Sequence, residues 1–504
     1  MDRRAFIKMG SALVVVTSVG CNLRTQKGVS RQYAITIDSN RSIGHLAREA
    51  VGREVSQDLS TDVLIVGGGI AGLAAACSLK DRESIICELG ARFGGTSSAV
   101  SIGNQQFSQG AHYDLSYPSF YGREGLELLE QLNIIEYNSK VGRWDFIDKQ
   151  HLIKSKIEER CYKNGEVFSS VLVDSELKLN FLDLMQPYEG RMPLPTTQIA
   201  PEDLALDQLS FAAYLNKYLP VTSDFMEAVD YQMIDDYGGR ADQVSALAGV
   251  HYYRCRPYYA NPEPEIFSPT EGNFYFIEKM MKHLQPEQMK ASSLVVGLEK
   301  LKKGWGVDVW EVEQERKVRY RCNNVVYAGQ KHLLKYLHAD GYKTFSDVIY
   351  APWIVINIEL EGDDLGKSIW QNDYLSSNAQ FLGFVNSGAQ TEEGNRVLTA
   401  YYCYPDVYHH MVQDVENGAE EIVEQTIGFI NTYFKQDIRS FVKHVYVKLL
   451  GHAMPMPVPG YLSKNRRLEL DGMTFAGADT GRLPLMFDAL DSGIQAGRLI
   501  GDKG

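Results

Sequence analysis

The stretch Thr61-Asp-Val-Leu-Ile-Val-Gly67-Gly-Gly69-Ile-Ala-Gly72 decides the fold of this chain. A short apolar run leads directly into glycines, as a buried parallel strand requires. The residues from Ile70 to Leu79 are small or apolar and suit a packed helix, and Ser84-Ile-Ile-Cys87 then repeats the apolar strand pattern. This order predicts a βαβ unit whose two strands are parallel.

The glycines fit G-x-G-x-x-G, the spacing at which a strand-to-helix turn binds a dinucleotide. Gly67 allows the tight turn, Gly69 lets a pyrophosphate approach the backbone, and Gly72 lets the helix pack closely on the strand. The helix begins with Ile70 and Ala71, and its free N–H groups and dipole favour phosphate there. The motif alone is weak evidence, because glycine-rich turns before helices are common.

Glu88 strengthens the interpretation, because it follows Gly67 by 21 residues at the end of the second predicted strand. At that position a carboxylate accepts hydrogen bonds from a ribose hydroxyl, and its charge disfavours a 2′-phosphate. The longer run Glu88-Leu-Gly-Ala-Arg92-Phe-Gly94-Gly95 fits E-x-x-x-R-x-G-G. Two later patterns accompany it, Phe475-Ala-Gly477-Ala-Asp479 with Asp491-Ser-Gly493-Ile-Gln-Ala-Gly497, and Pro269-Thr-Glu-Gly272-Asn273 with Leu294-Val-Val296.

Together these patterns resemble those of the flavin-containing amine oxidase and phytoene desaturase-like superfamily, in order from about residue 61 to residue 504. The resemblance implies FAD as the cofactor and an α/β fold, in which a Rossmann-like FAD-binding domain of the glutathione reductase-like, amine oxidase type carries an inserted α+β substrate domain. Thr96 stands where the family often has Arg, so one diphosphate contact is either missing or supplied elsewhere. The implied FAD-binding residues are Gly67, Gly69, Ile70, Ala71, Gly72, Glu88, Leu89, Gly94, Gly95, Thr96, Gly110, Ala111, Val296, Gly477, Asp479 and, near the flavin ring, Leu490.

We expect four parts in the chain. Residues 1–21 are a signal peptide and residues 22–60 a polar, aperiodic leader. The FAD-binding domain is discontinuous and takes residues 61–115, 266–345 and 451–504. The substrate domain takes residues 116–265 and 346–450.

The N-terminus resembles a bacterial twin-arginine export signal, with Arg3-Arg4 followed by a weakly apolar run from Ser11 to Gly20. The run is too short to span a membrane, which takes about 20 residues. Such signals commonly export proteins that fold around a cofactor first. We therefore expect a periplasmic protein, or one anchored to the membrane through a lipid on Cys21, if Ser18-Val-Gly-Cys21 is a lipoprotein cleavage site.

Amine oxidases of the superfamily use a lysine near the flavin and an aromatic pair that flanks the amine. No lysine stands in the expected strand around residues 350–356, and counting without gaps puts Met456 and Ala489 at the two aromatic positions. An amine substrate is therefore in doubt, because the cation–π attraction of the pair is lost. Asp235-Asp236 is interpreted as a solvated helix end rather than a carboxylate dyad.

Two histidines are catalytic candidates. His452 occupies the position from which some relatives link a cysteine to FAD, and a histidine can form such a link or act as an acid or base. His112 falls where the family's loop runs beside the flavin ring. A packing role is the alternative for each.

The charge and the cysteine spacing of the chain limit the classes of molecule that we expect it to bind. The chain of 504 residues carries 51 basic and 64 acidic side chains, a net charge of −13, with no basic stripe, which argues against nucleic acid. Its 7 cysteines form no C-x-x-C pair, so no metal site is indicated.

The sequence predicts an exported FAD-dependent oxidoreductase that takes a hydride from a small organic substrate onto flavin N5 and passes the electrons to oxygen, a quinone or a partner protein. No second G-x-G-x-x-G offers a nicotinamide site. Three alternatives remain open. They are an amine or polyamine oxidase in which the aromatic pair that flanks the amine, the aromatic cage, is remodelled, a desaturase or isomerase of an apolar substrate, and a redox-silent flavin-binding protein.

Overall fold

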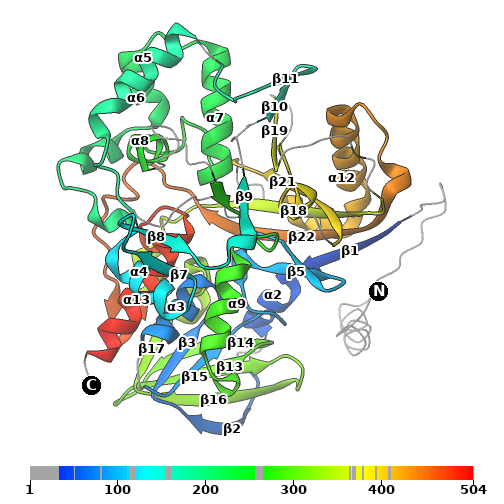
Figure 1. Ribbon diagram of the computed structural model, residues 1–504. Coiled ribbons are helices and arrows are strands. Elements are labelled where there is room, and N and C mark those ends of the chain that lie inside the picture. Colours follow the sequence, from blue (N-terminus) through cyan, green and yellow to red (C-terminus); the bar gives the residue numbers. More distant parts are fainter. Residues whose placement is uncertain are drawn as a thin grey trace, which may run out of the picture.

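Two large sheets and their helices make up the computed structural model (Figure 1). The residues that it describes are 33–49, 52–79, 82–110, 112, 121–154, 160–173, 175–255, 265–362, 365, 370–376, 380–391, 394–406 and 410–502. The predicted export signal, with Cys21, lies outside them. Within the described ranges no helix is long and apolar enough to cross a membrane, and no group of side chains has the make-up of a metal site.

The first sheet has six strands in the order β13-β4-β3-β17-β24-β23. Its central strand β3 is buried at every residue and pairs in parallel with β4 and β17, which confirms the βαβ prediction. Helices α3, α9 and α13 pack on one face of this sheet. The bounds are β3 Val63–Val66, β4 Ser84–Cys87, β13 Met289–Lys290, β17 Asn324–Tyr327, β23 Glu469–Leu470, β24 Met473–Phe475, α3 Ile70–Ser78, α9 Phe274–His283 and α13 Met486–Gly501.

A four-stranded sheet in the order β14-β15-β16-β2 covers the other face. Its first three strands form an antiparallel meander, and β2 pairs in parallel with β16. Two short helices, α10 and α11, pack beside it. The bounds are β2 Val55–Ser60, β14 Ser293–Lys300, β15 Trp305–Glu311, β16 Arg316–Cys322, α10 Leu334–Leu337 and α11 Ala339–Phe345.

The second large sheet has eight strands in the order β1-β22-β18-β21-β20-β19-β10-β11. Its long strand β18 is buried at every residue, because both faces are covered. Alternate side chains face a core shared with α5 to α8 and a core shared with α12, as the period of two in a strand requires. Figure 1 shows α5 to α8 above this sheet and α12 beside it.

The elements around the second large sheet are fixed as follows. Its strands are β1 Ala34–Ser39, β10 Arg160–Lys163, β11 Glu166–Phe168, β18 Tyr350–Leu360, β19 Gln371–Leu375, β20 Phe381–Asn386, β21 Arg396–Cys403 and β22 Val442–Pro455. Its helices are α5 Glu176–Met185, α6 Phe211–Tyr218, α7 Ser223–Tyr237, α8 Ala246–Cys255 and α12 His410–Phe434. Smaller elements are α2 Arg41–Glu49, α4 Arg123–Gln131, β5 Ala99–Ile102, β6 Gln105–Ser108, β7 Ile135–Asn138, β8 Arg143–Phe146, β9 Leu152–Lys154 and β12 Glu265–Phe267.

Two expectations about the division of the chain are wrong. The predicted leader contains β1, α2 and β2. Strand β1 pairs with β22 of the eight-stranded sheet, β2 pairs with β16 of the four-stranded sheet, and α2 packs on β14. The stretch from Tyr121 to Phe146 was assigned to the substrate domain, but α4 and its neighbours pack into the core beneath α3 and α13. Both errors arise because the stabilising contacts are distant in sequence, and local patterns do not reveal such contacts.

Candidate functional site

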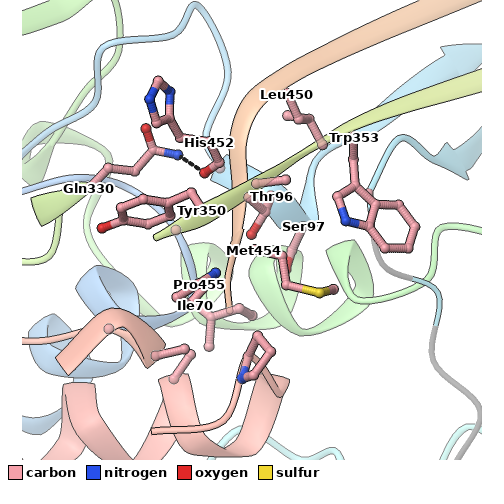
Figure 2. Close-up of a pocket in the computed structure, with 18 of the residues that line it drawn as sticks. Ile70, Thr96, Ser97, Gln330, Tyr350, Trp353, Leu450, His452, Met454 and Pro455 are labelled. Carbon is pink, nitrogen blue, oxygen red and sulfur yellow. Dashed lines mark hydrogen bonds between the residues drawn. The ribbon is translucent and has the colours of Figure 1, made fainter. Parts of the chain in front are cut away.

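One cavity of about 1020 Å³ runs between two halves of the fold, the nucleotide half around the six-stranded sheet and the substrate half around the eight-stranded sheet. One part of its wall is the glycine-rich turn between β3 and α3 with the loop that follows β4. The opposite part comes from β18, β22, α7 and α8. Figure 2 shows this meeting point, with Ile70 and Thr96 from the first part of the wall and Trp353 and Met454 from the second.

The three glycines of the G-x-G-x-x-G motif, the fingerprint, differ in the space that surrounds each Cα atom. Gly67 has a φ of +102°, and a Cβ there would lie 3.0 Å from the carbonyl oxygen of Ala328. A Cβ on Gly72 would lie 1.9 Å from the carbonyl oxygen of Gly67, so the helix packs on the turn at that point with no space for a side chain. A Cβ on Gly69 would meet only the carbonyl oxygen of Gly94, at 3.8 Å. Gly69 therefore leaves open the space into which a phosphate would fit.

Glu88 lines the cavity at the end of β4 and is 7% exposed. Its Oε2 accepts a hydrogen bond of 2.7 Å from the N–H of Gly68, and its Oε1 accepts one of 2.8 Å from the N–H of Gly90. Burial raises the pKa of the carboxyl, and the two backbone hydrogen bonds oppose that shift. A carboxylate oxygen can accept more than one hydrogen bond, so Glu88 can still accept one from a ribose hydroxyl.

Most of the residues predicted from the resemblance line this cavity. They are Gly67, Gly69, Ile70, Ala71, Glu88, Leu89, Gly94, Gly95, Thr96, Gly110, His112, His452, Gly477 and Asp479. Gly72 lies behind the turn, and Ala111 is outside the described residues.

Val296 and Leu490 do not line the cavity. Val296 packs under α2, a helix that was not predicted, and Leu294 and Val295 line the cavity in its place. Leu490 is 1% exposed and lies in the core beneath α3. Successive residues of a helix point about 100° apart, so Ala489 lines the cavity while its neighbour does not.

Asp479 is held by a lysine that the sequence patterns did not single out. Lys331 Nζ lies 2.8 Å from Asp479 Oδ1, and the Tyr350 hydroxyl donates a hydrogen bond of 2.7 Å to Oδ2. Lys331 is fully buried and also donates to the carbonyl oxygens of Gly329, at 3.0 Å, and Ala476, at 2.7 Å. Burial lowers the pKa of Lys331, and Asp479 opposes that shift. The only sequence signal was a lysine just beyond an apolar strand.

The two candidate histidines lie in different parts of the wall. His452 stacks on His332, with ring centroids 3.8 Å apart, and the Tyr350 ring meets it edge-on. Gln330 Nε2 donates a hydrogen bond of 2.5 Å to the carbonyl oxygen of His452, and in Figure 2 the imidazole extends away from Ile70. His332 was missed at the sequence level.

His112 belongs to the aromatic part of the cavity. Its ring lies 5.5 Å from that of Trp370 and 5.6 Å from that of Tyr401. Trp353 lines the same part and is 8% exposed. Among the described residues no acceptor lies within hydrogen-bonding distance of the indole N–H of Trp353 or Trp370. Both are therefore buried donors that lack an acceptor in the described part of the chain.

The acidic pair at the end of α7 is not a solvated helix end. Asp235 and Asp236 are half-buried and line the cavity, as Asp373 of β19 does. The count that placed Met456 at a cage position is also off, because Met456 packs in the core and Met454 lines the cavity. The cavity therefore combines indoles, a phenol, a thioether and carboxylates.

Comparisons with known proteins agree with this architecture. Residues 65–123 match a model of the NAD(P)-binding Rossmann-like domain. Putrescine oxidase bound to putrescine has a TM-score of 0.61 and 13% identity, with 88% of this chain and 99% of that chain covered. Cyclohexylamine oxidase from Brevibacterium oxydans IH-35A gives 0.61, 15%, 88% and 99%, and an oxidoreductase from Methanosarcina mazei gives 0.58, 12%, 86% and 99%.

No curated protein matches the sequence. The sequence identities to the solved structures are low, so these matches show a shared fold and not a shared activity. The chain thus contains a Rossmann-like dinucleotide-binding domain and has, over most of its length, the fold of these amine oxidases.

Proposed function

We propose that this protein is an exported FAD-dependent oxidoreductase that takes a hydride from a carbon–hydrogen bond of a small organic substrate. The observation that carries the proposal is the continuity of the cavity. A glycine-rich wall with the features of a dinucleotide site leads, without a partition, into a part lined by Trp353, Tyr401 and Asp235. A cofactor held by the first wall would therefore meet a substrate held by the second.

The residues present fit FAD. Gly69 and Gly95 leave space at the start of α3, where no side chain caps the helix and no acidic residue stands in the first turn. This is the environment that a pyrophosphate needs. Glu88 can accept a hydrogen bond from a ribose hydroxyl. The Asp479 carboxylate, which follows β24, is held by hydrogen bonds from Lys331 and Tyr350.

A bound flavin would supply the hydride acceptor, and the chain would supply orientation and exclusion of water. Trp353, Trp370 and Tyr401 would form an aromatic wall against which the substrate packs, because all three line the cavity. His112, between Trp370 and Tyr401, is the group best placed in this part to take up a proton. His452 is more distant from these aromatic residues, against His332 and Tyr350.

An amine is a second candidate for the substrate class. Asp235, Asp236 and Asp373 line the cavity, and carboxylates attract an ammonium group. Putrescine oxidase and cyclohexylamine oxidase share the fold. A neutral alcohol or an apolar substrate would gain no charge–charge attraction from these three side chains.

An absorbance spectrum of the purified protein, before and after acid precipitation, tests the cofactor. We expect a flavin spectrum, and colour retained in the pellet would reveal a covalent link, for which His452 is the nearest candidate from the resemblance. A colourless protein that FAD does not reconstitute would refute the proposal. Anaerobic mixing with diamines, monoamines, amino acids and alcohols then shows which class bleaches the flavin, and bleaching by alcohols alone would refute the amine candidate.

Export rests on the Arg3-Arg4 pattern, which lies outside the described residues. Fractionation of cells that produce the full chain should place it in the periplasm or the membrane, and Arg3→Lys together with Arg4→Lys should retain it in the cytoplasm. Release from the membrane by Cys21→Ala would establish a lipid anchor. An unchanged location of the double lysine variant would argue against the twin-arginine route.

A further inference from the structure

The segment before the fingerprint contributes to the same cavity. Ser39, Asn40, Arg41, Gly44 and His45 all line it. They belong to the end of β1 and the first turns of α2, in the stretch expected to be a leader. We call residues 39–47 the N-terminal strap.

One end of the strap is fixed to the substrate half of the fold. Strand β1 pairs in parallel with β22, from Ala34 opposite His444 to Ser39 opposite Leu449. The Ser39 hydroxyl donates a hydrogen bond to Glu416 on α12, and Arg41 Nη1 lies 3.0 Å from the same carboxylate. The strap therefore starts from a well-anchored point.

The other end is fixed to the nucleotide half. Ala47 is 4% exposed and packs with Leu294 and Val296 of β14, and Leu89 lies against the same cluster. These residues flank the segment whose resemblance implies adenine binding. A helix docked on them covers that part of the cavity from outside.

Asn40 brings a polar side chain to the same place. A Cβ built on Gly90 would meet Asn40 Nδ2 at 3.1 Å and Glu88 Oε1 at 3.2 Å, so the amide and the carboxylate both lie close to Gly90. Arg41 and Lys448 add two cations to the neighbouring wall, where Lys448 lies 2.8 Å from Asp38. These groups stand in a chain that has Thr96, rather than arginine, after its paired glycines.

We propose that the N-terminal strap is the outer wall of the nucleotide site, that Asn40 binds the ribose next to Glu88, and that docking of the strap retains the dinucleotide. This inference rests on the proposed function, because it takes FAD as the occupant of the cavity. It assigns to residues that precede the Rossmann domain a part in holding its cofactor.

Hydrogen exchange of the full chain, with and without added FAD, separates the two proposals. We expect FAD to slow exchange in peptides covering residues 67–72, 88–95 and 39–47. Slower exchange in the first two without any change in 39–47 would overturn the role of the strap and leave the cofactor intact. No change in any of the three would overturn FAD binding itself.

Release of FAD from the purified holoprotein, followed by the fluorescence of free flavin, gives a second measurement. Asn40→Ala removes one neutral hydrogen bond and should speed release about three- to tenfold. Ala47→Glu places a charge in the buried contact with Leu294 and should speed release more than about tenfold, because it undocks the strap. Ser42→Ala is the matched control, since Ser42 lies on α2, is exposed and does not line the cavity.

The expected order of release rates is Ser42→Ala equal to the parent, then Asn40→Ala, then Ala47→Glu. Equal rates for all four proteins would overturn the proposal. If Ala47→Glu fails to fold, Asn40→Ala and its control still decide, because Asn40 is half-buried and packs in no apolar core.

Discussion

Replacement of Lys331 by methionine tests the buried network that fixes Asp479. The lysine is fully buried and all three of its ammonium hydrogens have acceptors, namely Asp479 Oδ1 and the carbonyl oxygens of Gly329 and Ala476. Removal of one partner from a buried ion pair costs about 3–5 kcal/mol. Because Tyr350 and the Lys331 N–H still donate to Asp479 Oδ2, we expect the lower end, about 3 kcal/mol of unfolding free energy.

Urea unfolding of the apoprotein measures this loss, with tryptophan fluorescence and circular dichroism as two probes whose coincidence shows a single transition. The matched control is Lys331→Met combined with Asp479→Asn, which removes the stranded charge together with its partner. We expect the double variant to regain more than half of the lost free energy, because the cost lies mainly in the uncompensated carboxylate. A single variant within about 0.5 kcal/mol of the parent, or a double variant no more stable than the single one, would refute the reasoning.

Further predictions concern the glycine turn and a buried acid. Gly69→Ala should fold normally and lose FAD affinity by about tenfold or more, because its Cβ enters only the phosphate space, whereas Gly72→Ala should destabilise the apoprotein through its 1.9 Å clash with Gly67; titration with FAD and thermal melts separate the two. Burial raises the pKa of Asp488 to about 6, opposed by Arg482. The stability that Asp488 contributes is thus full below its unfolded pKa near 4 and is lost as the pH rises through 6. Asp488→Asn should therefore remove roughly 2 kcal/mol of the difference in unfolding free energy between pH 4.5 and pH 6.5, and an unchanged difference would count against a raised pKa.

Local patterns predicted most of the residues that line the cavity around the glycine-rich turn, for a physical reason. The turn at Gly67 is built from neighbouring residues, and its steric demands can be read from their spacing. Lys331 was missed because its role depends on Asp479, which is 148 residues away. The strap was missed because β1 is an edge strand with half of its residues exposed, and α2 is stabilised by packing on β14 rather than by an apolar stripe of usual length.

The substrate half shows a different limit. Counting back from glycine landmarks assumes that no residue is inserted, and it led to Ala489, which lines the cavity. It could not report the side chains that the inserted helices bring to the same space, because the position of α7 relative to β18 depends on their shared core. Asp235 and Asp236 were therefore misinterpreted as solvent-facing.

The carboxylates that α7 and β19 bring to the cavity bear directly on the choice between an amine and a neutral substrate. A cation–π contact contributes about 0.5–2 kcal/mol, which is what a missing aromatic pair forfeits. One carboxylate about 4 Å from an ammonium group contributes roughly 4 kcal/mol at the effective dielectric constant of about 20 that applies near protein surfaces. Three carboxylates, Asp235, Asp236 and Asp373, line this cavity, so they can offer a cation an attraction that takes the place of the absent pair. The missing aromatic pair therefore does not argue against an amine once these carboxylates are considered, and a neutral substrate would gain no charge–charge attraction from them.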